Sequence, residues 1–150
     1  MAEQKYEVLK LENQLCFPLY ALAKETIKLY RPLLDEINLT YTQYIAMMVI
    51  WEKEKINVKE LGKRLYLDSG TLTPVLKSLE AKGFITRHRS AEDERILMVE
   101  ITDKGTALKD EAVKIPGQIV SNIEISLDDA IVMHRQLYNL LEQLTEKKQD

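Results

Sequence analysis

Residues 68–83, which read DSGTLTPVLKSLEAKG, predict a helix with two contrasting faces. Its apolar residues recur at the spacing i, i+3, i+4, i+7 and are Leu72, Val75, Leu76 and Leu79. The opposite face carries short hydroxyl side chains and one cation: Ser69, Thr71, Thr73, Lys77 and Ser78. Asp68 or Ser69 can cap its start, and Gly83 can end it. Such a helix suits the DNA major groove, although the pattern alone favours an ordinary amphipathic surface helix.

Two helices are predicted before this stretch. Residues 40–43 read TYTQ and match a capping box, in which Thr40 caps the helix and Gln43 reaches back. That helix runs to about Trp51, with its core side chains expected at Ile45, Met48 and Val49. Residues 57–65 predict a short helix with Val58, Leu61 and Leu65 inward. A short turn then leads into residues 68–83, which completes a helix-turn-helix.

After Gly83 the apolar period changes from that of a helix to that of a strand. Residues 85–89 and 96–101 both alternate with period two, and the polar segment 90–94 separates them. This pattern predicts a β-hairpin with a charged tip. The predicted fold class is therefore mainly α with a small β-hairpin wing (α+β), a winged helix-turn-helix.

Long apolar-striped helices are predicted on both sides of the winged unit. The first starts near residues 13–15 and is ended with the help of Pro32. Thr102 caps another that runs to about Ile123 with a kink at 116–117, and Ser126 starts the last. A small winged unit cannot cover these stripes, so a partner subunit is expected to do so. At 150 residues we predict one domain, 1–150, with the winged unit at about 40–102 and dimerisation helices at about 11–35 and 103–146.

Charge is distributed unevenly along the chain. The whole chain carries a net charge of −3, but residues 53–95 hold 10 Lys and Arg against 7 Asp and Glu. The local excess of +3 surrounds the helix of residues 68–83, as a DNA-binding surface requires. No apolar run is long enough for a membrane span and no signal peptide opens the chain, so we expect a cytoplasmic protein without a membrane partner.

Little in the sequence points to catalysis or to a metal. No Ser-His-Asp set, glycine-rich phosphate loop or pair of carboxylates stands out, so the chain is not predicted to be an enzyme. His88 and His134 are far apart, and no second histidine or cysteine lies at metal-ligand spacing. We therefore predict no metal and no other cofactor.

Cys16 is the one cysteine of the chain, which rules out an internal disulfide. A lone cysteine on an apolar stripe is usually an inert, buried small hydrophobe. The predicted position of Cys16 in the first turn of a helix favours a different role, because N–H groups and the helix dipole there stabilise a thiolate. A thiolate is the reactive form of cysteine.

The chain resembles the MarR family of winged-helix regulators. The resemblance is carried by LDSGTLTP at 67–74, KSLEAKGFI at 77–85, Arg87, DER at 93–95 and ITDKG at 101–105. The segment LENQLCF at 11–17, with Tyr30 and Tyr41 downstream, resembles the one-cysteine branch that senses organic hydroperoxides, the OhrR type. The resemblance implies a homodimeric repressor in which a thiolate at Cys16 reacts with an organic hydroperoxide. It also implies that Tyr30 and Tyr41 of the partner subunit hold the thiolate.

The predicted DNA-binding residues lie on the central helix and the hairpin. Ser69, Thr71, Thr73 and Lys77 are expected to enter the major groove. Two interpretations stay open for the hairpin residues Arg87, Arg89, Asp93 and Arg95. They form a solvated charged face, or Asp93 pairs with an arginine to stiffen the wing while Arg95 reaches the minor groove. Two symmetric helices would read an inverted-repeat operator with half-sites ~34–36 Å apart or a multiple of that.

Our leading interpretation is a transcriptional repressor that leaves double-stranded DNA when Cys16 is oxidised. The nearest alternative is a MarR-type repressor released by a small aromatic ligand between its two lobes, with Cys16 passive. A thiol peroxidase using Cys16 would lack a resolving cysteine and would leave the winged unit unexplained. A helical scaffold that binds only proteins would show no salt-sensitive DNA binding.

Overall fold

The structure is a computed structural model that describes residues 5–146, and the backbone divides into two compact units, Met1–Ile115 and Pro116–Asp150. The helices within the described residues are η1 Glu7–Leu9, η2 Leu11–Asn13, α2 Cys16–Glu36, α3 Tyr41–Lys53, α4 Val58–Leu65, α5 Ser69–Ala81, α6 Asp103–Ala112, α7 Ile115–Ser121 and α8 Leu127–Glu146. The strands are β1 Lys55–Asn57, β2 Ile85–Arg89 and β3 Leu97–Ile101. None of these helices is long and apolar enough to cross a membrane.

The helix-turn-helix forms where the cap residues predict it. Thr40 accepts a hydrogen bond from the Gln43 amide at 3.3 Å, and the Gln43 side chain accepts one from the Thr40 amide at 3.1 Å, so α3 starts with a complete capping box. Asp68 caps α5 by accepting from the Thr71 amide at 2.8 Å. These contacts satisfy amides that an α-helix leaves without an internal partner. The predicted winged helix-turn-helix is confirmed.

The core positions of α3 differ in part from the prediction. Val49 is buried as expected, but Met48 is 46% exposed and Ile45 is only half-buried. The buried residues are Gln43, Tyr44, Ala46, Met47, Val49 and Ile50. The reason is that α3 contacts α2, α4, α5 and β3, so that its buried surface spans most of the helix circumference. The spacing of apolar residues identifies one buried stripe of a helix. It does not show which side stays exposed when several elements pack around that helix.

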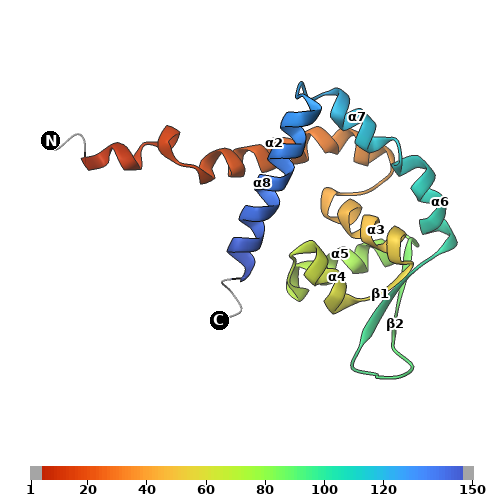
Figure 1. Cartoon of the computed structure of the whole chain (residues 1–150). Coiled ribbons are helices and arrows are strands. Elements are labelled where there is room, and N and C mark those ends of the chain that lie inside the picture. The colour runs from red at the N-terminus through yellow and green to blue at the C-terminus, as the bar shows by residue number, and fades with distance from the viewer. Residues whose placement is uncertain (1–4, 147–150) are drawn as a thin grey trace. The chain divides into compact units, whose positions relative to one another are not determined.

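The wing is the edge of a three-stranded antiparallel sheet rather than a separate hairpin. Strands β2 and β3 form the predicted hairpin, and β1 adds to the other side of β3 in the order β1-β3-β2. The β1 strand was missed because it has three residues, too few for an alternating pattern to show. It anchors the wing, since Ile56 and Ile85 both lie buried on strands that flank the buried Val99. The connection between β2 and β3 extends away from the helices (Figure 1).

The prediction that Pro32 ends the first long helix is wrong, because α2 continues to Glu36 with Pro32 inside it. Pro32 is exposed, so the carbonyl that loses its helical partner there can be hydrated. Beyond Pro32, the residues Leu34, Ile37 and Leu39 are all buried in the core. Burial of Leu34 within α2, and of Ile37 and Leu39 directly after it, stabilises this path of the chain and offsets the one missing hydrogen bond.

A second correction concerns the region after Thr102. Thr102 caps α6 as predicted, by accepting from the Gly105 amide at 3.1 Å. The predicted kink at 116–117 is instead a break at residues 113–114, so that α6 ends at Ala112 and α7 begins at Ile115. Pro116 has no N–H to donate to the carbonyl of Ala112, four residues earlier, and it suits the first turn of a new helix.

The second unit exposes the apolar stripe that the sequence predicts for its last helix. Ser126 starts α8 by accepting from the Asp129 amide at 3.1 Å. No residue of α8 is buried within the described chain, and Leu127 is 76% exposed. Ile131 and Tyr138 are about half exposed. These exposed side chains form an apolar stripe of the kind that marks protein–protein contacts.

The wing and α5 are joined by a three-point contact between Glu80 and Arg87. The Arg87 amide donates to one carboxylate oxygen of Glu80 at 3.0 Å, and the guanidinium donates to the other at 3.2 and 2.9 Å. The Arg87 side chain is only 18% exposed and that of Glu80 is 37% exposed. These bonds fix the first strand of the wing to the last turn of α5.

We predict that Glu80→Gln lowers the free energy of unfolding at neutral pH by less than about 1 kcal/mol, since water screens the part-exposed pair. The hydrogen bond from the Arg87 side chain holds the pKa of Glu80 below its ordinary value of 4.5. A lowered folded-state pKa means that this stabilisation is present above about pH 4.5 and is lost as the pH falls through the folded-state pKa. Urea unfolding at several pH values should therefore show a shallower acid decline for Glu80→Gln. Glu111→Gln, at an exposed position of α6, is the control, and identical curves for Glu80→Gln and wild type would contradict the assignment.

Candidate functional site

The outward face of α5 carries most of the polar residues that the sequence assigns to it, but Ser78 is half-buried and accepts from the Gln43 side chain at 2.9 Å. Leu72, Leu76 and Leu79 are buried, which fixes the opposite side of the helix toward solvent. Ser69, Thr71 and Lys77 are exposed, and Thr73 is half-buried with its hydroxyl donating to the Ser69 carbonyl at 2.7 Å. The Thr71 amide lowers the pKa of Asp68 by donating to its carboxylate, so the cap stays ionised at neutral pH. The start of α5 is therefore a fixed polar surface.

The tip of the wing is organised by Asp93 and Arg95. Asp93 accepts from the Arg95 amide and from its guanidinium, all at 3.0 Å, and these bonds lower the pKa of Asp93. The Arg95 side chain is nevertheless 90% exposed. Arg89, also exposed, donates to the Arg95 carbonyl at 3.4 Å. The predicted pairing of Asp93 with an arginine is present, and two guanidinium groups gather at one tip.

Arg87 is the predicted hairpin residue that lies apart from this tip. Its guanidinium is turned toward α5 and held by Glu80, so it is mostly withdrawn from solvent. The structure thus supports Arg87 as a joint between α5 and the wing, whereas Arg89 and Arg95 present charge outward.

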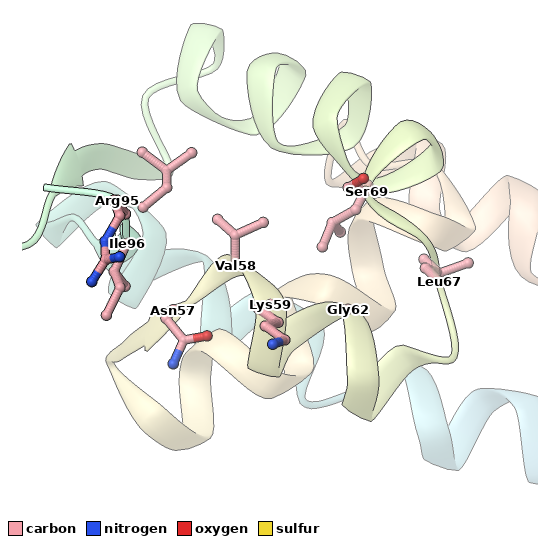
Figure 2. A pocket seen from close by; sticks show the side chains of 10 residues that line it. Asn57, Val58, Lys59, Gly62, Leu67, Ser69, Arg95 and Ile96 are labelled. Atoms are coloured by element: carbon pink, nitrogen blue, oxygen red, sulfur yellow. The ribbon is translucent and has the colours of Figure 1, made fainter. Parts of the chain in front are cut away.

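An open groove of about 570 Å³ separates the start of α5 from the wing. Figure 2 shows Ser69 at one end, Arg95 and Ile96 at the other, and Val58 of α4 between them. Lys59 and Arg95 are the charged residues of its lining, and both are cations. The start of α5, the groove and the wing tip therefore follow one another along a surface whose lining charge is positive.

Cys16 is the first residue of α2 and is exposed with a free thiol. No side chain caps α2, and its first turn contains no acidic residue. The amides at this end are therefore available to a negative charge, as predicted for a first-turn cysteine. The surrounding surface is apolar, with Leu15, Phe17 and Tyr20 all exposed.

Tyr30 and Tyr41 lie together, with ring centroids 5.0 Å apart. Tyr44, which the sequence analysis did not single out, completes the cluster at 5.8 Å from Tyr30 and 6.5 Å from Tyr41. Burial raises the pKa of all three phenols, so each keeps its proton at neutral pH and can donate a hydrogen bond. The signal for Tyr44 was its spacing, three residues after Tyr41 on the same helix.

Cys16 and this tyrosine cluster do not meet within one chain. Cys16 and Tyr30 both belong to α2 and are 14 residues apart. At about 1.5 Å per residue the helix separates them by about 21 Å. A site containing both groups therefore requires the tyrosines of a second copy. Among residues 5–146, no group of three His, Cys, Asp or Glu side chains is arranged to hold a metal ion.

Known proteins with similar sequences are transcriptional regulators. A family profile described as transcriptional regulator SarA/Rot matches residues 28–112. The organic hydroperoxide resistance transcriptional regulator of Bacillus subtilis is 51% identical over 145 residues, which cover 97% of this chain and 99% of that protein. The HTH-type transcriptional regulator SarZ of Staphylococcus saprophyticus is 46% identical over 87% of this chain and 90% of its own.

A solved structure with the same fold is that of reduced AbfR bound to DNA, a protein of Staphylococcus epidermidis. It is 31% identical, covers 95% of this chain and 99% of its own, and has a TM-score of 0.77. MarR of E. coli bound to operator DNA, at 24% identity and a TM-score of 0.73, shares the fold. The relatives from Bacillus subtilis and Staphylococcus saprophyticus are named as transcriptional regulators rather than as enzymes, and they match 97% and 87% of this chain. The chain therefore belongs to the SarA/Rot family of transcriptional regulators, which are MarR-like winged-helix proteins.

Proposed function

We propose that this protein is a DNA-binding transcriptional repressor that releases its operator when an organic hydroperoxide oxidises Cys16. The observation that carries the proposal is the exposed thiol of Cys16 at the start of α2, in a chain 51% identical to an organic hydroperoxide resistance regulator. AbfR, a DNA-binding protein of this fold, has been solved in a reduced and an overoxidized form, both bound to DNA, and in a disulfide form, which supports oxidation as a property of such a protein.

The active form in this proposal is a homodimer. Exposed apolar side chains on α2, such as Leu22 and Ile27, and on α8, such as Leu127 and Ile131, supply surfaces for a second copy. The separation of Cys16 from Tyr30 along α2 gives an independent reason, because only a partner can bring tyrosines to the cysteine. A two-fold dimer presents two α5 helices and therefore suits an inverted-repeat operator.

In the DNA complex, Ser69, Thr71, Thr73 and Lys77 of α5 enter the major groove. Hydroxyl groups on that face reach phosphates and base edges, and Lys77 neutralises phosphate charge. At the wing tip, Arg89 and Arg95 reach the neighbouring minor groove. Asp93 holds Arg95 in place, and Arg87 fixes the angle between wing and α5 through Glu80.

The signal is a two-electron oxidation of sulfur. The Cys16 thiolate attacks the terminal oxygen of the hydroperoxide, so that an S–O bond forms and the O–O bond breaks. The sulfur loses two electrons and becomes a sulfenic acid, and the departing alkoxide takes a proton from solvent and leaves as the alcohol. Tyr30 and Tyr41 of the partner, whose phenols keep their protons, donate hydrogen bonds that stabilise the thiolate before attack.

Oxidation changes the dimer because it adds an oxygen atom and removes the negative charge that the tyrosines hold. A packed interface cannot absorb the added volume without moving its elements. If the shift rotates the two winged units, the α5 helices no longer match two groove sites at once. To change the operator from almost fully occupied to almost fully free, oxidation must lower the affinity of the protein for DNA by about 10⁴-fold.

A second candidate function is release by a small aromatic ligand with Cys16 passive, and one observation favours it. The groove of about 570 Å³ between α5 and the wing is lined largely by apolar residues, among them Val58, Leu67, Leu72 and Ile96. A ligand there would lie between two parts of the proposed DNA surface. Release by such a ligand would survive in Cys16→Ser, whereas release by hydroperoxide would not.

The dimer is tested by sedimentation. The protein at micromolar concentration should sediment with twice the mass of the chain. Ile131→Glu, on the exposed stripe of α8, should shift the equilibrium toward the monomer because it places a charge in an apolar contact. Ile96→Glu, the same change on the exposed wing, is the control and should leave the dimer intact. A wild-type monomer at this concentration would remove the proposal.

The DNA surface is tested with Lys77→Ala. This change should weaken binding and reduce the slope of log K against log salt by about 0.9 for each phosphate that the protein no longer neutralises. Lys109→Ala removes another exposed lysine, on α6, and serves as the control for loss of positive charge. Titrations at several salt concentrations measure both quantities. An unchanged slope in Lys77→Ala and in Arg95→Ala would show that the DNA lies elsewhere.

The redox switch is tested with Cys16→Ser and Tyr41→Phe. Cys16→Ser should bind DNA normally and ignore cumene hydroperoxide. Tyr41→Phe should slow oxidation of Cys16 about tenfold, the factor that a charge-assisted hydrogen bond of ~1.5 kcal/mol represents. Mass spectrometry follows oxidation with time, and Tyr66→Phe, at an exposed tyrosine at the end of α4, is the matched control. Peroxide-driven release of Cys16→Ser would place the switch at another residue.

A further inference from the structure

Gln43 is a buried polar residue that the proposed chemistry does not use. It is only 6% exposed, the single polar or charged side chain buried to this degree in the described part of the chain. Its side-chain amide donates to the Ser78 hydroxyl of α5 at 2.9 Å. Its side-chain oxygen accepts from the Thr40 amide at 3.1 Å and from the Lys82 ammonium at 2.8 Å. A buried amide with three partners defines one arrangement of the groups around it.

Lys82 extends this contact to the end of α2. Its ammonium donates to the Asn38 carbonyl at 2.7 Å as well as to Gln43, and burial lowers the pKa of Lys82. Asn38 lies in the turn between α2 and α3 with a φ of 56°, and Lys82 is the C-cap residue of α5. The end of α5 is therefore tied at one point to the α2–α3 turn and to the start of α3, which lie about 40 residues earlier in the sequence.

The same first turn of α3 carries the tyrosines of the proposed sensor. Tyr41 is the first residue of α3, and Tyr44 follows one turn later. Gln43 lies two residues after Tyr41, which places it on the opposite side of that turn. Because the capping box holds the turn rigid, a displacement of the Tyr41 side must displace Gln43 as well.

On α5, the two partners of Gln43 lie beside the proposed DNA face. Ser78 follows Lys77 directly, and Ser78 and Lys82 are four residues apart on one side of the helix. The buried side chains of α5 itself, Leu72, Leu76 and Leu79, are all apolar. Apolar contacts are non-directional, whereas the bonds of Gln43 have a preferred geometry and fix the position of α5 along α3.

We propose that Gln43 is the positioning residue that transmits the oxidation state of Cys16 from the tyrosine cluster to the recognition helix α5. The inference rests on the proposed function and deepens it by assigning the contact through which the signal passes. Movement of Tyr30 and Tyr41 shifts the first turn of α3, and the bonds from Gln43 to Ser78 and Lys82 carry this shift into α5. Gln43 itself touches neither the thiol nor the DNA.

The test uses two pairs of variants in the full-length protein. Gln43→Met keeps the shape of the side chain and removes its hydrogen bonds. Gln43→Glu keeps the acceptor for Thr40 and Lys82, and it offers the Ser78 hydroxyl an acceptor in place of the amide donor. Ser78→Ala removes one bond from a half-buried site, and Ser78→Thr keeps the hydroxyl. DNA selected from a random pool by the reduced wild-type protein is the probe, and cumene hydroperoxide is the oxidant. The readouts are the rate of Cys16 oxidation and the Kd before and after oxidation.

Gln43→Met and Ser78→Ala should oxidise at the wild-type rate but lose about fivefold or more in the ratio of oxidised to reduced Kd. Gln43→Glu and Ser78→Thr should recover most of this ratio. A purely structural role would lower stability and reduced-state affinity while leaving the ratio unchanged, and that result in Ser78→Ala overturns the inference. If wild-type protein shows no change in Kd on oxidation, the proposed function itself fails.

Discussion

The rise of an α-helix is the constraint on which the proposed sensing site depends. Cys16 and Tyr30 occupy one continuous helix, and about 21 Å of helix separates them. Side-chain rotation does not close that distance, so in the proposed site the thiol and the tyrosine hydrogen-bond donors come from different chains. In that proposal, the exposed apolar side chains of α2 would both join the two copies and bring the two halves of the site together. The proposed sensing site therefore forms only in the dimer.

The position of α3 suits the proposed transmission of a change from the dimer interface to the DNA-binding surface of the first unit. This helix contacts α2, α4, α5 and β3, so it has little room to move independently of them. Its buried side chains are mainly apolar and make non-directional contacts, whereas Gln43 adds a directional bond to α5. Interiors packed at crystal-like density respond by discrete rearrangement. In the proposed mechanism, the buried amide of Gln43 converts a small shift of α3 into a discrete change in the position of α5.

Helix starts were predictable from the sequence because a cap such as Thr40 satisfies amides within three residues of itself. The end of α2 was misplaced because burial of Leu34 outweighs the local effect of Pro32, and burial is a property of the whole fold. The candidate site was predictable in part, since residue types on α5 and the wing show where charge and hydroxyl groups gather. They do not show which groups are already paired. The partners of Gln43 in and at the end of α5 lie 35 and 39 residues away in the sequence, so these contacts can be seen only in the folded structure.

The two arginine pairs of the wing differ in a way that matters for a protein whose net charge is negative. Arg87 is mostly buried against Glu80, and three bonds hold it there, so phosphate cannot readily take the place of Glu80. Arg95 is almost fully exposed beside Asp93, and exposed pairs of this kind contribute little to stability. Exchanging Asp93 for a phosphate oxygen therefore costs Arg95 little and releases counterions from DNA. Arg87 therefore stabilises the shape of the wing, whereas Arg95 stays accessible to a phosphate group.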